Sequence, residues 1–379
     1  MYFHAPRILH MGLKIYLQHI FEKFSAGKNW QIKATVLLTV LSLFFAFPSY
    51  SSLNVADWQE LFAKAASPFT NSMAGYGSHD AKITFRLVMP LLVAVLHLNI
   101  AGVLLLTGLI GILNFYLVIN LSYRITNDKV MAVITGLCCC FIYFGKCSFI
   151  ELRGGMFDGI AMCFLLLTLI TNNNWLRAVL VFFSAWTDER GLIASSLIWV
   201  YIVYQHRNEP FTKKILNGGA IGLYIAWLAY AVIRYILTHQ YGLKTDTGGT
   251  GPSVLLNQIN NIPIGVWSGL EGLWLLPLYA LALLYRNKKY FELLMFAGSC
   301  ALIVIVGVSV LDITRSEMYA LPAVFISLMV MRDYSNKQTL ERILFYALVL
   351  CFAYPAYYTG GKSSIWWTYP LPLQLLRFI

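Results

Sequence analysis

Residues 101–122 have the sequence AGVLLLTGLIGILNFYLVINLS, a run without one charged side chain. A helix needs about 20 predominantly apolar residues to cross the hydrocarbon core of a bilayer. This stretch therefore predicts a transmembrane helix, and similar runs recur along the chain.

The overall composition points the same way. Of the 379 residues, 59% are hydrophobic and 12% are charged, whereas a soluble domain carries roughly 25% charged residues. The apolar runs are continuous rather than alternating, which disfavours a membrane β-barrel. The predicted fold class is an all-α, polytopic transmembrane bundle in contact with a lipid bilayer.

The apolar runs predict about eleven spans and one shorter helix at 87–98, lying at the membrane interface with Pro90 in its first turn. The predicted spans are 33–50, 101–122, 130–147, 156–172, 175–187, 190–205, 214–237, 264–285, 291–310, 317–332 and 341–358. The chain then divides into an amphipathic cytoplasmic segment, a transmembrane domain with two outer loops, and an outer interfacial tail. These parts are 1–32, 33–358 with loops 51–100 and 238–263, and 359–379.

The positive charges are unevenly distributed between the two faces. With the N-terminus inside, the inner segments hold 17 of the 28 Lys and Arg and six of the 17 Asp and Glu. Such an excess is typical of cytoplasmic loops, so we expect the N-terminus in the cytoplasm and the C-terminus outside. The net charge of +11 therefore indicates topology, and no nucleic-acid partner is predicted.

Acidic and basic residues gather at four junctions on the predicted outer face. Ionisable groups at a bilayer boundary are costly unless they are hydrated, paired or in a cavity. We therefore expect one shared polar site rather than four separate helix-end salt bridges, with Glu271 in the eighth span as a further candidate. The junction residues are Asp57, Glu60, His79, Asp80 and Arg86; Glu151, Arg153 and Asp158; Asp188, Glu189 and Arg190; and Asp312, Arg315 and Glu317.

These residue types suit sugar transfer from a lipid phosphate. Such a reaction needs a carboxylate base for the acceptor hydroxyl and cations for the leaving phosphate. It also needs a groove at the bilayer edge for the lipid tail. No Cys/His motif of a metal site occurs, and His79 alone makes none. A divalent cation stays open as a cofactor.

Four short motifs add a resemblance to the GT-C superfamily of polytopic membrane glycosyltransferases. Residues 85–92, FRLVMPLL, are similar to an R-x-x-x-P-x-L stretch that closes the first outer loop in some bacterial members. Residues 156–161 resemble the start of their fourth span, and TDERGLI at 187–193 resembles a T-[KR]-E-x-G-L turn. Asp312–Arg315, followed by Pro322, is similar to an outer D-x-x-R.

The resemblance covers about 33–332 and departs at two points. Many members carry two adjacent acids in the first loop, whereas in this sequence Asp57 and Glu60 stand three apart. Many members also carry a soluble C-terminal domain, which is not predicted for this sequence. The resemblance implies transfer from a polyprenyl-phosphate-linked sugar donor to a glycan, lipid or protein acceptor, at the outer face of a bacterial inner membrane.

The resemblance also implies roles for the junction residues. Asp57 or Asp80 would be the base, and Arg190 and Arg315 would bind phosphate with support from Arg153. Asp188 and Glu189 would orient the arginines or the acceptor. The alternatives are a transporter or flippase of lipid-linked saccharides, a polymerase or ligase of lipid-linked glycans, and a non-catalytic scaffold.

Overall fold

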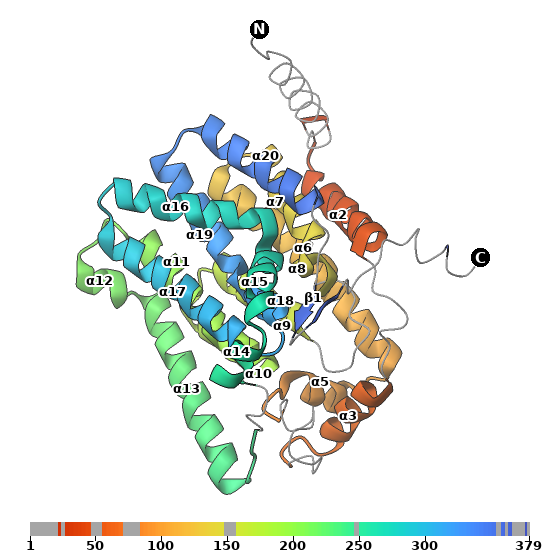
Figure 1. Cartoon of the computed structure of the whole chain (residues 1–379). Helices are drawn as coiled ribbons and strands as arrows, with labels where there is room; N and C mark the ends of the chain where they lie inside the picture. Colours follow the sequence, from red (N-terminus) through yellow and green to blue (C-terminus); the bar gives the residue numbers. More distant parts are fainter. Residues whose placement is uncertain are drawn as a thin grey trace.

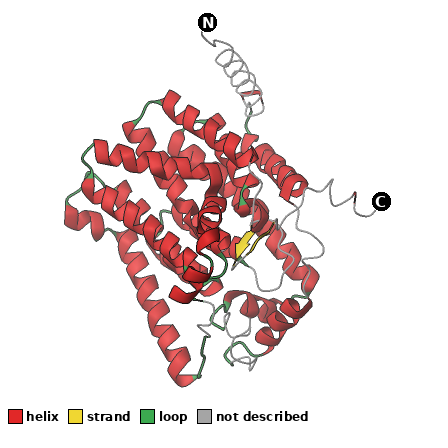
Figure 2. Ribbon diagram, viewed as in Figure 1, coloured by secondary structure: helices red, strands yellow, loops and turns green. Residues whose placement is uncertain are grey.

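The computed structural model describes residues 22–23, 27–46, 55–70, 84–147, 157–245, 250–353, 358–360, 363–365 and 376. Within these residues the chain is a bundle of α-helices with one small antiparallel hairpin (Figure 1, Figure 2). This confirms the predicted helical fold class.

The first half of the chain contains α2 (Trp30–Ala46), α3 (Val55–Ala66), α5 (Val88–Leu96), α6 (Ile100–Thr126), α7 (Lys129–Phe141), α8 (Tyr143–Cys147), α9 (Asp158–Ile170), α10 (Asn174–Thr187) and α11 (Glu189–Gln205). The second half contains α12 (Phe211–Ile215), α13 (Gly218–Gln240), α14 (Pro252–Asn257), η2 (Ile259–Asn261), α15 (Ile262–Leu270), η3 (Glu271–Trp274), α16 (Leu275–Arg286), α17 (Tyr290–Val308), α18 (Ile313–Glu317), η4 (Met318–Ala320), α19 (Leu321–Tyr334) and α20 (Lys337–Ala353). Two strands follow, β1 (Tyr358–Gly360) and β2 (Ser363–Ile365).

Polar side chains fix where four of these helices begin. The side chain of Asn99 accepts a hydrogen bond from the backbone N–H of Gly102, so α6 starts directly after it. Asp128, Asn173 and Asn217 cap the starts of α7, α10 and α13 in the same way, each bonding the N–H three residues on. Such caps satisfy N–H groups that would otherwise have no partner.

Among the described residues, five helical stretches are long and apolar enough to cross a bilayer: Ile100–Thr126, Gly218–Gln240, Ile259–Arg286, Tyr290–Val308 and Ile313–Tyr334. Each of the other predicted spans also contains a helix, but these helices are shorter. The chain is thus a helical membrane protein.

The helix α19 forms the centre of the bundle. Every side chain from Leu321 to Met331 is buried. The helices α6, α11, α16 and α20 pack around α19. A helix that is apolar on all sides needs such a surrounding shell.

The surface of the bundle carries apolar stripes. On α6, Leu105, Leu109 and Ile112 are exposed at helical spacing, and Leu228 and Val232 are exposed on α13. Soluble proteins rarely expose continuous apolar faces of this kind. These stripes are consistent with contact with lipid.

Three predicted segments differ from the structure. The predicted span 264–285 is broken at Glu271, whose φ of +47° is rare for an L residue. There Gly272 packs against the carbonyl oxygen of Ala347 on α20, too close for a side chain at position 272. The predicted span 130–147 is divided at Ile142, whose backbone is extended. The predicted tail begins with the hairpin, whose Thr359 N–H donates to Thr314 Oγ1 at 3.1 Å.

Candidate functional site

Asp188 is the single residue between α10 and α11. Its backbone N–H donates to the carbonyl oxygen of Ser184, which ends α10, and its side chain accepts from the N–H of Arg190, which begins α11. Gly191 makes this tight turn possible, because a Cβ there would collide with Ser184 and lie 2.8 Å from its carbonyl oxygen. The turn fixes the direction of the Asp188 and Arg190 side chains.

Asp188 is 2% exposed and is surrounded by guanidinium groups. Arg190 donates to it with Nε and Nη2, both at 2.7 Å. Arg86 Nη2 lies 3.1 Å and Arg315 Nη2 3.7 Å from its Oδ2. Burial alone would raise the pKa of Asp188, but the charges of Arg190 and Arg86 outweigh burial and hold that pKa well below its ordinary value. Asp188 is therefore ionised at neutral pH.

Asp158 is the second buried carboxylate, at the first residue of α9. It accepts a hydrogen bond from Arg315 Nε at 2.6 Å and one from the Tyr319 hydroxyl at 2.9 Å. Arg190 Nη2 lies 3.3 Å from Asp158 Oδ1, the oxygen that accepts from Tyr319. Arg190 and Arg315 each reach both aspartates, so α9, the α10–α11 turn and α18 are joined through one ion-pair network.

The rim of this network is looser and more accessible. Glu189 lies 3.3 Å from Arg86 and 3.9 Å from Arg234. Arg86 and Arg234 are 18% and 30% exposed, against 3% for Arg315. Arg234 also stacks over the ring of Phe85 at 4.1 Å from its centroid. We call Arg86, Asp158, Asp188, Glu189, Arg190, Arg234, Asp312 and Arg315 the charged cluster.

An apolar groove of about 490 Å³ adjoins the charged cluster. It is lined wholly by apolar side chains from several helices, among them Leu91 of α5, Phe183 of α10 and Leu237 of α13. Three lining residues stand within two positions of charged-cluster residues: Leu87 beside Arg86, Trp186 beside Asp188 and Ile233 beside Arg234. An apolar groove and an ionic network thus share one boundary. In Figure 1, α5 and α3 lie together beside the lower part of the bundle.

The structure brings together residues from all four predicted junctions. Seven predicted residues belong to the charged cluster, namely Arg86, Asp158, Asp188, Glu189, Arg190, Asp312 and Arg315. Asp57 is buried on α3 and Glu60 lies on the same helix. The other predicted site residues, His79, Asp80, Glu151 and Arg153, lie outside the residues that the structure describes. Whether the cluster is catalytic stays a prediction.

Glu317 is predicted as part of this site but points elsewhere. It is fully buried, and its carboxyl group packs against Gly307 of α17. Both of its carboxyl oxygens lack a hydrogen-bond partner among the described residues. The direction of α18 decides this, because Arg315 and Glu317 stand two apart and therefore face different sides of a helix.

Tyr319 was not singled out from the sequence. Its spacing of four from Arg315 places both on one helical face, which is the signal that could have found it. Arg234 was likewise not among the residues predicted for the site. No group of three Asp, Glu, His or Cys side chains in the described part of the chain is placed to hold a metal ion.

Comparisons with protein-family models, with curated proteins and with solved structures find no match for this chain.

Proposed function

We propose that this protein is a GT-C-like membrane glycosyltransferase that uses a polyprenyl-phosphate-linked sugar. The observation that carries the proposal is that the apolar groove lies next to the charged cluster. A lipid-linked sugar donor has the same two parts, a long apolar tail and an anionic phosphate, joined in the same order.

The groove suits an isoprenoid tail. Such a tail has no hydrogen-bonding group, and the groove offers only apolar side chains to it. Its volume of about 490 Å³ falls within the range of ordinary ligand pockets, about 300–1,000 Å³. The rest of a long tail would stay in the surrounding lipid.

The rim of the charged cluster suits the phosphate. Arg86 and Arg234 are the more exposed guanidinium groups, and both pair loosely with Glu189. Phosphate oxygens can replace that carboxylate, because guanidinium forks bind both anions. In this proposal Arg190 and Arg315, which the resemblance assigns to phosphate, act from behind by holding Asp158 and Asp188 in place.

The base is Asp57 or Asp80 in this proposal. The helix α3, which carries Asp57, packs directly against α5, and α5 lines the groove. The proposal also keeps about eleven spans in a bacterial inner membrane, with the N-terminus inside and the reaction at the outer face. The carboxylate of Asp57 or Asp80 would take the proton of the acceptor hydroxyl.

A transporter of lipid-linked saccharides is the second candidate. One observation favours it: Glu271 and Glu317 are fully buried in candidate spans, and their carboxyl oxygens lack hydrogen-bond partners among the described residues. Ionisable groups inside spans often belong to proton or substrate pathways.

Sugar transfer by the purified protein in vesicles tests the proposal. A panel of polyprenyl-phosphate sugars is supplied as donor, and Asp57→Asn, Asp80→Asn and Arg86→Gln are compared with the wild type. One aspartate variant should lose at least about 100-fold in turnover, because general base catalysis contributes that much. Arg86→Gln should mainly weaken donor binding, since it removes a charge-assisted contact.

Arg286→Gln is the matched control, because Arg286 is exposed at the other predicted face. Equal turnover in all variants would contradict the site assignment. Movement of the labelled lipid across the bilayer without sugar transfer would favour the transporter, and growth of the product by whole saccharide blocks would favour a polymerase.

A further inference from the structure

A polar cavity, which we call the basic cavity, lies at the opposite ends of the helices that hold the charged cluster. In α9, Asp158 is the first residue and Ile170, which lines the cavity, is the last; in α11, Arg190 and Gln205 stand likewise near the two ends. At 1.5 Å per residue these pairs are roughly 18–22 Å apart. The cavity is therefore a separate site, on the face predicted to be cytoplasmic.

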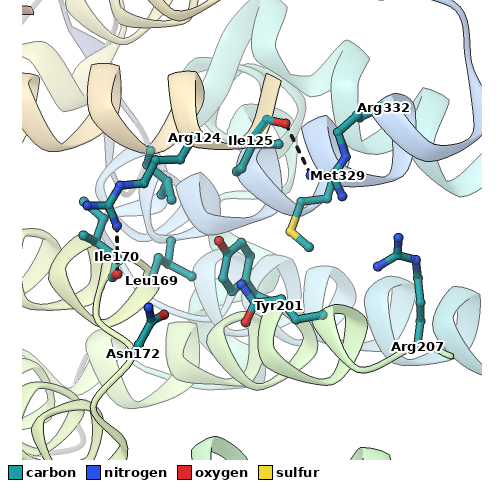
Figure 3. A pocket seen from close by; sticks show the side chains of 11 residues that line it. Arg124, Ile125, Leu169, Ile170, Asn172, Tyr201, Arg207, Met329 and Arg332 are labelled. Carbon is teal, nitrogen blue, oxygen red and sulfur yellow. Dashed lines mark hydrogen bonds between the residues drawn. The ribbon is translucent and has the colours of Figure 1, made fainter. Parts of the chain in front are cut away.

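The cavity has a volume of about 380 Å³ and three arginines at its edge. Figure 3 shows Tyr201 between Arg124 on one side and Arg207 and Arg332 on the other. These residues come from α6, from α11 and the turn that follows it, and from α19. Segments that are distant in sequence thus build one cationic edge.

Each guanidinium group is held by a carbonyl oxygen at a helix end. Arg124 donates to Ile170 O at 3.1 Å, and Arg332 donates to Ile125 O at 3.3 Å (Figure 3). Arg207 donates to Tyr204 O at 3.3 Å. These bonds alone could be helix-end contacts. However, a guanidinium has five N–H donors, and Arg124 uses one of them among the described residues.

The arginines outnumber the carboxylates around them. Asp333 is 2.8 Å from Arg207 and 3.0 Å from Arg332, and it also accepts from the Tyr204 hydroxyl. Two cations therefore share one anion. Arg124 has no ion-pair partner in the described part of the chain, and no acidic residue lines the cavity. The site carries a surplus of positive charge that a bound anion would neutralise.

We propose that this cavity binds a phosphate group, carried by an anionic phospholipid headgroup or free in the cytoplasm. Guanidinium forks fixed in position match the geometry of phosphate oxygens. Asn172 adds a polar group at the edge, and the floor is apolar, with Leu121 and Leu169 buried. Basic pockets between helices at a cytoplasmic face bind phosphorylated headgroups in other membrane proteins. The proposed glycosyl transfer plays no part in this inference.

The test uses two arms with the purified full chain. In the first arm, thermal unfolding is compared in nanodiscs of phosphatidylcholine with and without about 20% phosphatidylglycerol, whose headgroup carries an anionic phosphate. In the second arm, inorganic phosphate is titrated onto protein in a neutral detergent. A bound ligand should raise Tm in proportion to the logarithm of its concentration. A response in the first arm alone identifies the headgroup as the source, and a response in the second alone identifies free phosphate.

Arg124→Gln should raise the apparent Kd about tenfold or more, because it removes a charge-assisted contact. Asn172→Asp keeps every arginine and adds a negative charge at the edge, so it should weaken binding without disturbing the helix ends. Arg286→Gln is the control, because Arg286 is exposed and lies outside the cavity. The proposal is overturned if neither arm raises Tm in the wild type, or if Arg124→Gln and Asn172→Asp bind as tightly as Arg286→Gln.

Discussion

Asp188 ends one helix, begins the next and holds two further arginines from other parts of the chain. An isolated carboxylate in such a buried place would take up a proton rather than keep its charge. Here three guanidinium groups keep it ionised. Removing one partner from a buried ion pair costs about 3–5 kcal/mol, because the remaining charge is left unpaired. The turn that holds Asp188 against its arginines therefore matters for stability.

Gly191→Ala should disturb this turn. The new methyl group would press on Ser184, whose backbone cannot move away without breaking the end of α10. Overpacking of this kind costs about 1–3 kcal/mol, so Tm should fall in thermal unfolding in detergent. Gly298→Ala on α17 is the matched control, because nothing lies within 4 Å of its added Cβ. That variant should match the wild type or gain up to about 1 kcal/mol. Equal Tm values for the two variants would show that the turn is not tight.

At the scale of elements, the groove depends on how α5, α10 and α13 pack together. The helix α10 packs against α9, α11 and α13, while α5 packs mainly against α3 and touches α10. Aromatic and aliphatic side chains line the space between these helices without filling it. A cavity of about 490 Å³ remains. The helix α5 can line this space because Pro90 sits in its first turn, where the missing N–H costs nothing.

Leu91→Trp should partly fill the groove. If the groove holds the isoprenoid tail, the Michaelis constant for a long-chain donor should rise about tenfold, while turnover at saturation stays close to that of the wild type. A donor with a short tail should be affected less. Leu294→Trp is the control, since Leu294 is 65% exposed on α17 and lies outside the groove. An equal effect of both substitutions would indicate a general loss of stability instead of a filled groove.

At the scale of the whole molecule, the charged cluster and the basic cavity occupy opposite ends of shared helices. Such an arrangement fits the predicted topology, in which surplus cations mark the cytoplasmic face. The same face carries Asp128 and Lys337, which pair at 2.6 Å. Burial opposes the charge on Asp128, but the hydrogen bond from Lys337 keeps the pKa of Asp128 below its ordinary value.

Cysteine labelling tests this orientation. Glu209→Cys, after α11, and Leu256→Cys, on α14, place thiols at exposed positions. In sealed spheroplasts a membrane-impermeant maleimide should label Leu256→Cys and leave Glu209→Cys unlabelled until the membrane is permeabilised. The unmodified chain gives the background, and its six described cysteines are buried. Labelling of Glu209→Cys from outside sealed cells would reverse the topology.

The sequence by itself determined the class of fold, and each span that it predicted contains a helix in the described residues, although two of these spans are interrupted. Long apolar runs and polar caps act over a few residues, so they can be recognised without tertiary contacts. It also indicated which junctions carry charge. The break at Glu271 was not predictable, because it depends on the close approach of α20 to Gly272.

Only the tertiary structure decided which charges meet. Arg315 pairs with Asp158, which is 157 positions away, while Glu317, two residues on, is turned toward α17. The apolar groove and the basic cavity arise in the same way, from helices that are distant in sequence. Pairing and packing depend on distance in space, which a residue pattern along one chain does not contain. The hydrophobic pattern therefore placed the helices, and their packing placed the sites.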